Sequence, residues 1–133
     1  MADKSDVIHR WIDQSEESLA AAKLLLDAGY LNDATSRAYY SIFQAAKAAL
    51  LSINIETRSH TGVFNQLGKH LVQTGYLDKN LSRILASAYQ LRQESDYKIH
   101  LLKINHVDVE TVIVDAEKFV AEIKDFLSKS NDS

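Results

Sequence analysis

The chain has 133 residues, of which 46% are hydrophobic and 25% are charged, and its formal net charge is −3. This length suits one ordinary domain whose core needs no disulfide or metal to hold it. There is no cysteine, which excludes disulfides, cysteine-ligated zinc, iron–sulfur clusters and a thiol nucleophile. There is no proline either, although average usage of about 5% would give about six or seven. Because proline breaks helices, its absence favours long helices over sandwiches and barrels.

Nothing in the sequence has the pattern of a targeting or membrane segment. The first eleven residues lack the apolar stretch of a signal peptide, and no apolar run approaches the roughly 20 residues of a membrane-spanning helix. Since the chain also lacks cysteine, we expect a cytoplasmic protein with no membrane contact.

Apolar residues recur at spacings of three and four along most of the chain, which predicts helices. The first helix spans 8–26 and ends at Gly29, because glycine accepts the left-handed conformation of a helix end. A second helix starts at Asn32 or Asp33, whose side chains can cap exposed amide groups, and it runs to about Asn54. Its many alanines, which would let a neighbouring helix approach closely, stand at positions 34, 38, 45, 46, 48 and 49.

A short connection and a short helix come next. Residues 54–60 are predicted to form the connection, with the side chains of 56–60 exposed. Ser59 or Thr61 then caps the third helix, and Gly75 marks its end.

Two further helices complete the chain. The fourth spans 78–97 or 80–97, depending on which residue caps it. Residues 98–106 allow either a fraying helix end or an extended connection. The last helix begins near Asp108, and the tail 128–133 is predicted to be disordered.

These elements predict an all-α fold, an antiparallel up-and-down bundle of four to five helices. No linker, repeat or low-complexity tract divides the chain. We therefore expect one domain over 1–133, with its core at about 5–127.

The net charge hides an uneven distribution. Residues 1–33 carry 3 Lys or Arg against 7 Asp or Glu, residues 34–106 carry 9 against 4, and residues 107–133 carry 3 against 7. The middle segment also holds four of the five histidines. This pattern allows two interpretations, namely ordinary solvated helix faces or a cationic surface that receives an anionic group such as phosphate.

The first candidate motif lies in the second helix, around Arg37, Tyr39 and Tyr40. On a helix, Tyr39 and Phe43 share one face, whereas Tyr40 lies about 100° away. The tyrosines either fill the core with their hydroxyl groups hydrogen-bonded, or they line a site together with Arg37.

The second candidate motif, Arg58-Ser59-His60-Thr61-Gly62, stands at a predicted helix start. Backbone amides at a helix start can hold an anion, and Arg58 and His60 could assist. The alternative is a helix cap with exposed polar neighbours. A lone histidine also suits acid–base chemistry, although the spacing provides no partner for it.

The third candidate motif contains Arg92, Ser95, Asp96 and Tyr97, with His100 beyond it. Arg92 and Asp96 are four residues apart, so they can pair on a helix. An exposed pair would contribute only about 0.3–0.5 kcal/mol. A buried Asp96 would instead orient Arg92 toward a ligand or a partner helix.

Common nucleotide-binding, zinc-protease and hydrolase signatures are absent from the sequence. The histidines also lack the spacing of metal ligands. We therefore predict no cofactor and no metal site.

Taken together, these motifs resemble the HEPN superfamily (higher eukaryotes and prokaryotes nucleotide-binding), and within it the small stand-alone UPF0332-type proteins of bacteria and archaea. The resemblance covers about residues 5–127. The motifs that carry it are Ser18-Leu19-Ala20-Ala21-Ala22, Gly29-Tyr30, Asp33-Ala34, Arg37-Ala38-Tyr39-Tyr40, Phe43-Gln44-Ala45-Ala46-Lys47, His60-Thr61-Gly62-Val63, Arg92 with Asp96-Tyr97, and Ala116-Glu117-Lys118-Phe119-Val120.

The resemblance implies an antiparallel helical bundle that is often dimeric and is commonly paired with a minimal nucleotidyltransferase in a toxin–antitoxin-like module. In several such modules the helical protein cuts RNA, and in some the nucleotidyltransferase adenylylates a tyrosine. Active HEPN ribonucleases carry an arginine, four to six further residues and then a histidine. In this chain seven residues separate Arg92 from His100, and Asp96 stands near the usual histidine position. Because aspartate is ionised at neutral pH, it would repel phosphate.

We therefore expect a homodimeric, non-enzymatic partner subunit of a minimal nucleotidyltransferase, which binds a nucleotide or an RNA phosphate. The expected ligand-binding residues are Arg37, Tyr40, Arg58, His60, Arg92, Asp96 and Tyr97. One alternative is a metal-independent ribonuclease toxin that uses Arg92 with His100 or His60. Another is a non-catalytic dimeric scaffold.

Overall fold

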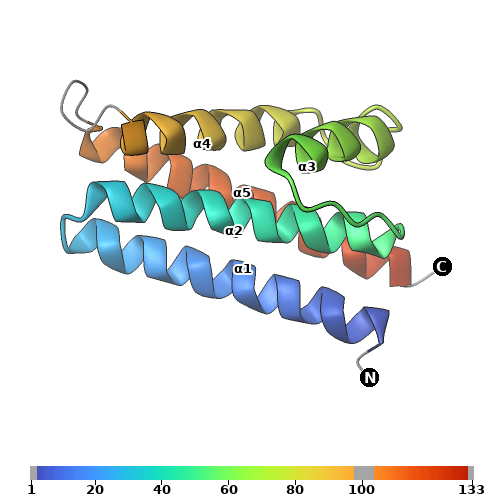
Figure 1. Ribbon diagram of the computed structural model, residues 1–133. Helices are drawn as coiled ribbons and strands as arrows, with labels where there is room; N and C mark the ends of the chain where they lie inside the picture. The colour runs from blue at the N-terminus through green and yellow to red at the C-terminus, as the bar shows by residue number, and fades with distance from the viewer. Residues whose placement is uncertain (1–2, 98–103, 132–133) are drawn as a thin grey trace.

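The computed structural model describes residues 3–97 and 104–131, and these residues form helices joined by short connections (Figure 1). The elements are α1 (Lys4–Asp27), α2 (Leu31–Ser52), α3 (His60–Leu67), a π-helix that extends α3 (Gly68–Val72), α4 (Asn80–Tyr97) and α5 (His106–Asn131). The described part contains no strand, which confirms the predicted all-α bundle. Within this part, no helix combines the length and apolar character needed to cross a membrane.

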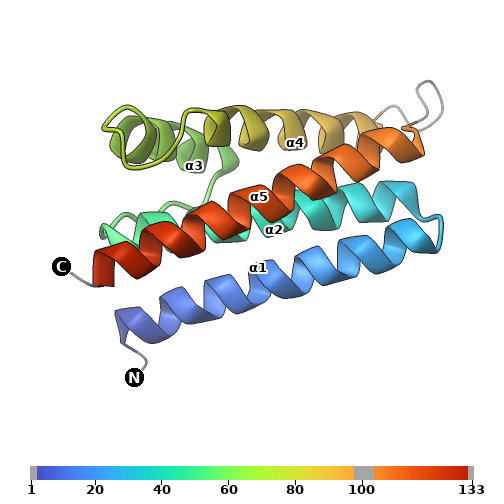
Figure 2. The same cartoon turned by 180° about the vertical axis from the view of Figure 1, so that it is seen from behind.

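The long helix α2 lies at the centre of the bundle. It packs against α1, α3, α4 and α5. Figure 1 shows α1 and α2 side by side in opposite directions with α3 and α4 on the far side of α2, and Figure 2 shows α5 lying across α2 from behind. The first and last described residues lie at the same end of the bundle.

The sequence of α2 explains its central position. Six alanines of this helix are fully buried, at positions 34, 38, 45, 46, 48 and 49. Because an alanine side chain is small, the backbones of neighbouring helices can approach closely. The largest buried side chains facing this helix and its neighbours include Phe119 and Ile123 of α5. A buried hydrogen bond, Ser15 Oγ to the Ser41 carbonyl at 2.8 Å, ties α1 to α2.

The start of α2 differs from the prediction. This helix begins at Leu31, and its N-cap residue, Tyr30, makes no side-chain hydrogen bond to the helix. The prediction that Asn32 or Asp33 caps the helix is therefore wrong. Asn32 instead accepts a hydrogen bond from Ser95 Oγ at 2.8 Å, which ties the start of α2 to the end of α4.

The start of α3 follows the prediction in one respect and departs from it in another. Ser59 is the N-cap residue, and its Oγ accepts a hydrogen bond from the Gly62 amide at 2.9 Å, as predicted. His60 and Thr57 are partly buried rather than exposed, because α3 packs against α2 and α4. Gly75 has a φ of +88° and ends the segment, as predicted.

The C-terminal part also contains one correction. The final helix begins at His106 and continues to Asn131, so residues 128–131 are helical and not the disordered tail that we predicted. Most of the ambiguous segment 98–106, namely 98–103, lies outside the described residues, as do the last two residues of the tail.

Candidate functional site

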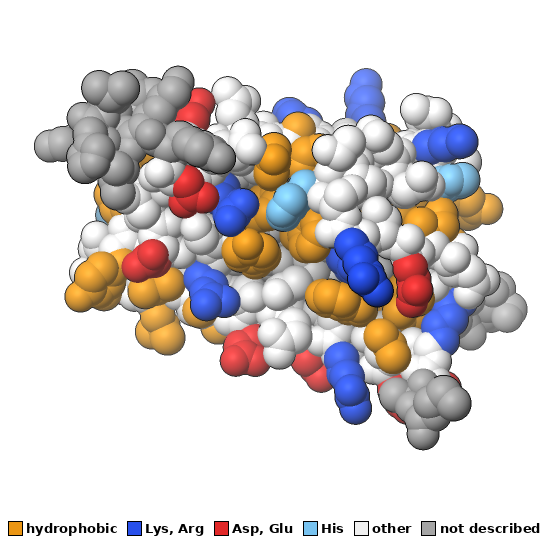
Figure 3. All heavy atoms as spheres, in the orientation of Figure 1, with side chains coloured by type: hydrophobic (Ala, Val, Ile, Leu, Met, Phe, Trp, Pro, Cys, Tyr) orange, Lys and Arg blue, Asp and Glu red, His pale blue; other side chains and the backbone are white. Residues whose placement is uncertain are grey.

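Aromatic and charged side chains from three helices meet on one face of the bundle. They come from the middle of α2, the first residue of α3 and the last turns of α4, and they are Tyr39, Tyr40, His60, Arg92 and Asp96. We refer to these five residues as the Arg92 site. The face in Figure 3 carries a hydrophobic patch over α2 and α4, bordered by a histidine and by Lys or Arg side chains.

The guanidinium group of Arg92 is held against two tyrosine rings. Arg92 Nη2 donates a hydrogen bond to Tyr40 Oη at 3.1 Å. The guanidinium carbon lies 5.0 Å from the ring centroid of Tyr40 and 5.6 Å from that of Tyr39, within the range of cation–π attraction. The side chain of Arg92 is only 22% exposed. These contacts fix the position of a positive charge at the protein surface.

Arg92 has more donors than its neighbours satisfy. Its Nε is buried and has no hydrogen-bond partner among the described residues. Nη2 of Arg92 lies 3.8 Å from Asp96 Oδ2, which is an ion pair but too long for a hydrogen bond. Because Nε is buried, an anion can reach Arg92 only through its Nη groups, whose N–H donors suit a phosphate with several oxygens.

Asp96 pairs with Arg92, as the spacing of four residues predicts, but it does not neutralise the site. Its side chain is 49% exposed, so water screens its charge. At this separation Asp96 helps to orient Arg92 and leaves its donors open.

His60 is paired with a buried tyrosine. Tyr39 is fully buried, and its hydroxyl group is hydrogen-bonded to His60 Nδ1. Burial raises the pKa of Tyr39 well above the usual tyrosine value, so the phenol stays protonated and can donate. Burial and, to a lesser extent, the nearby Arg92 charge lower the pKa of His60, so the imidazole is neutral at pH 7. The hydrogen bond with Tyr39 permits either imidazole tautomer; with the phenol as the donor, the imidazole proton is on Nε2 and His60 offers a hydrogen-bond donor.

Further aromatic rings hold His60 in place. Its ring centroid lies 4.9 Å from that of Phe43 and 5.4 Å from that of Tyr89. Phe64 in turn packs edge-on against Tyr89, with centroids 5.2 Å apart. Ring contacts of this kind restrict the orientation of each member, so His60 presents a fixed face beside Arg92.

Gly62, two residues after His60, allows the close contact between α3 and its preceding loop. A Cβ atom at Gly62 would lie 2.0 Å from Thr57 Oγ1 and 3.2 Å from Thr57 Cβ, and only 2.8 Å from the capping Ser59 Oγ. Rotation of the threonine hydroxyl cannot relieve both contacts with Thr57, so the loop must move. The close packing of Gly62 against Thr57 fixes the start of α3 and with it the position of His60.

We therefore predict that Gly62→Ala lowers the free energy of unfolding by about 1–3 kcal/mol, through crowding and loss of the Ser59 cap. The matched control is Gly68→Ala, because Gly68 has helical angles (φ −60°, ψ −48°) and open space around its Cβ position. The control should be neutral or stabilising by up to about 1 kcal/mol. Urea denaturation of both variants measures the difference, and equal stabilities would contradict the assignment.

The structure brings together four residues that the sequence predicted for the site, namely Tyr40, His60, Arg92 and Asp96. Tyr39 also belongs to the cluster, although it was not among the expected ligand-binding residues. Its apolar helical spacing indicates only a core residue, and it is fully buried as such. Nothing in the sequence signals that its hydroxyl group meets a histidine 21 positions away.

Two other candidates, Arg37 and Arg58, stand apart from this cluster. Arg37 and Arg58 are exposed, and neither makes a hydrogen bond or ion pair with the described residues. Arg37 lies one turn before Tyr40 on α2, so it flanks the site at the surface. Tyr97 ends α4, but its side chain lies outside the described part, and so does His100. The described residues include no cluster of three or more metal-ligating side chains that could hold an ion.

A comparison with protein families decides which family the chain represents. The model of the HEPN domain matches residues 8–126. The chain belongs to the HEPN domain family. This confirms the resemblance drawn from the arginine, tyrosine and histidine motifs.

Similar proteins come from archaea and bacteria. The HEPN chain is 38% identical over 127 residues to a Methanocaldococcus jannaschii protein named "Putative toxin". The matched region covers 96% of this chain and 93% of that protein. It is 32% identical over 118 residues to a UPF0332 protein of Gloeobacter violaceus, covering 89% and 94% of the two chains. It is 36% identical over 104 residues to a UPF0332 protein of Pyrococcus horikoshii, covering 78% and 70%.

Proposed function

We propose that this HEPN domain is the helical partner subunit of a minimal nucleotidyltransferase in a toxin–antitoxin-like module, and that it binds a phosphate group of RNA or of a nucleotide at the Arg92 site. The observation that carries phosphate binding is the Arg92 guanidinium, which two tyrosine rings and Tyr40 Oη hold in place while its side chain stays 22% exposed. The relatives named as toxins support the module.

The groups around Arg92 suit a phosphate in both geometry and charge. The guanidinium fork can donate two parallel hydrogen bonds to one phosphate, and His60 Nε2 can add a third. The competing charge, Asp96, lies 3.8 Å away and is half exposed. At this distance in water-like surroundings two unit charges interact by only about 1 kcal/mol, less than a bidentate arginine–phosphate contact contributes.

Titration with a single-stranded uridine oligonucleotide, followed by amide NMR of the full chain, tests phosphate binding. We expect shifts confined to the middle of α2, the start of α3 and the end of α4. Titration with ATP in parallel separates RNA from a free nucleotide. Shifts elsewhere, or none with either ligand, would contradict the proposal.

The module itself needs a separate experiment. We expect the chain to copurify as a homodimer with the product of the adjacent reading frame, and that product to be a nucleotidyltransferase. Intact-mass measurement of the copurified chain reports whether an AMP group has been added to a tyrosine. Light scattering gives the mass of the assembly, and a chain that stays monomeric and alone would argue against this part of the proposal.

The state of His60 predicts how binding depends on pH. Because its pKa is lowered, His60 is neutral at pH 7 and gains its proton only below about 6.5. Protonation adds a positive charge beside the bound phosphate, so RNA affinity should stay nearly constant above about pH 6.5 and rise as the pH falls below it. His60→Gln should abolish most of this rise. The control His70→Gln should keep it, since His70 lies in a different pocket.

A metal-independent ribonuclease is the second candidate, favoured by the proximity of His60 to Arg92 and by the relatives named as toxins. A general base needs an unprotonated Nε2, whereas donation from the Tyr39 phenol to Nδ1 would leave the imidazole proton on Nε2. We therefore expect the purified protein to leave single-stranded RNA intact in the presence of EDTA. Cleavage that disappears in both Arg92→Ala and His60→Ala would instead establish the ribonuclease.

A further inference from the structure

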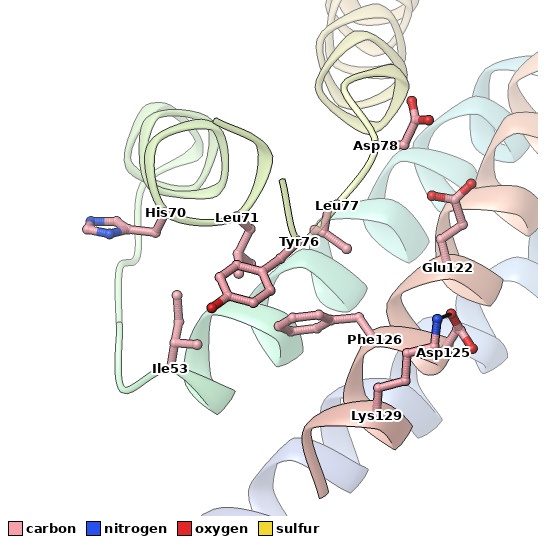
Figure 4. A pocket seen from close by; sticks show the side chains of 10 residues that line it. All are labelled: Ile53, His70, Leu71, Tyr76, Leu77, Asp78, Glu122, Asp125, Phe126 and Lys129. Atoms are coloured by element: carbon pink, nitrogen blue, oxygen red, sulfur yellow. Dashed lines mark ion pairs between the residues drawn. The ribbon is translucent and has the colours of Figure 1, made fainter. Parts of the chain in front are cut away.

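A groove lies apart from the Arg92 site, where the turn after the π-helix faces the last turns of α5. Its volume is about 780 Å³, within the range of binding pockets. Figure 4 shows the rings of Tyr76 and Phe126 in its middle, with three carboxylates on one side of the rings and His70 on the other. Ile53, Leu71 and Leu77 form the apolar part of its lining.

A tight turn builds this groove. Gly75 has a φ of +88°, which reverses the chain, and the Leu77 amide donates to the Leu71 carbonyl at 2.8 Å. Leu77 is buried beneath the turn, whereas the neighbouring Tyr76 is 70% exposed. The Tyr76 ring packs edge-on against Phe126 of α5, with centroids 6.3 Å apart. The turn therefore holds an aromatic ring at the surface.

The rim of the groove is acidic. Asp78, Glu122 and Asp125 line it against a single ammonium group, that of Lys129. Lys129 pairs with Asp125 at 3.0 Å, and both side chains are mainly exposed. Asp78 and Glu122 have no such pairing with Lys129, so the apolar lining has a negatively charged rim.

We propose that this groove docks a short apolar segment of a partner protein that carries Lys or Arg beside its apolar residues. The apolar floor and the exposed Tyr76 ring suit aliphatic or aromatic side chains, and aromatic side chains of this kind often dominate interfaces. The carboxylates complement the basic residues of such a segment. This surface goes beyond the proposed function, because it shares no residue with the Arg92 site.

The charge of the groove separates this occupant from the others. RNA, nucleotides and anionic lipids would face Asp78 and Glu122, the two carboxylates that Lys129 does not pair with, and these repel phosphate. A second copy joined through a two-fold axis would place the same acidic rim against itself. A segment with apolar and basic residues is repelled in neither way, because its positive charges face the carboxylates.

Selection from a phage-displayed library of random peptides of roughly twelve residues, long enough to fill such a groove, tests the proposal on the full chain. We expect enrichment of peptides that combine Leu or aromatic residues with Lys or Arg. Fluorescence polarisation then measures a selected peptide against variants. Tyr76→Ala and Glu122→Lys should each weaken its binding at least about tenfold, or about 1.4 kcal/mol.

Two variants complete the test. Glu110→Lys makes the same charge reversal on α5 outside the groove and should leave peptide binding unchanged. Arg92→Ala should also leave it unchanged, so the groove can fail or succeed independently of the proposed phosphate site. The proposal is overturned if no peptides are enriched, if the enriched peptides lack positive charge, or if the groove variants bind them as well as the native chain does.

Discussion

Replacing Arg92 with alanine is expected to weaken binding of a single-stranded RNA oligonucleotide by about 10- to 150-fold. A hydrogen bond to a charged group contributes about 1.5–3 kcal/mol, and each 1.4 kcal/mol corresponds to a factor of ten. Arg92 is already held by Tyr40 Oη and two tyrosine rings, so little side-chain entropy is lost when it binds a ligand. Fluorescence anisotropy at a fixed salt concentration measures the change.

Two control variants distinguish specific binding at the Arg92 site from general electrostatic attraction. Arg37→Ala removes the same charge one helical turn from Tyr40, but Arg37 is exposed and makes no hydrogen bond or ion pair with the described residues. Its effect should stay within about threefold, mainly as a reduced salt dependence. Arg92→Lys keeps the charge but loses the planar fork, so it should fall between the native chain and the alanine variant. Equal losses in the two alanine variants would contradict a specific site.

The largest expected effect on stability is at Phe119. This side chain of α5 is 0% exposed, in the core against α2 and its neighbours. Phe119→Ala removes buried apolar surface and leaves a cavity, which the surrounding helices fill only in part by relaxing toward it. We expect the free energy of unfolding to fall by about 3–5 kcal/mol, a large share of the total for a domain of this size.

Tyr76→Ala is the matched control, since it also truncates an aromatic ring but at a surface position. Tyr76 is 70% exposed and contacts Phe126 only through its ring edge, so the loss should be below about 1.5 kcal/mol. Chemical denaturation of both variants gives the comparison. A Phe119→Ala variant that is no less stable than the Tyr76→Ala variant would show that the core is not packed as described. The same control shows whether Tyr76→Ala is folded for the peptide experiment.

Local patterns in the sequence determined most of the secondary structure. Apolar spacings of three and four predicted the helices. Gly29 and Gly75 were predicted to end helical segments, and in the structure both have a φ of +88°. The Ser59 cap and the pairing of Arg92 with Asp96 were also predictable, because each involves residues three or four apart. The prediction that Asn32 or Asp33 caps α2 failed because of a distant contact. The Asn32 side chain accepts a hydrogen bond from Ser95, 63 positions along the chain.

The site depended on contacts that no local pattern contains. Arg92 and Tyr40 are 52 positions apart, and Tyr39 and His60 are 21 apart. Periodicity shows which face of a helix is buried, but the packing of side chains from different helices sets their relative register. That packing placed Tyr40 beside Arg92 and left Arg37 in solvent. It also placed His60 partly buried beside a positive charge, and both the burial and the charge lower the pKa of His60.

The sequence by itself thus determined a helical chain of the HEPN type with a basic middle segment between acidic ends. Only the tertiary structure decided which of its basic residues form one site and which remain on the surface. The physical reason is that charge and helix propensity are properties of single residues and their near neighbours. Hydrogen bonds, burial and pKa shifts at the Arg92 site instead arise from residues that meet only when α2, α3 and α4 pack together.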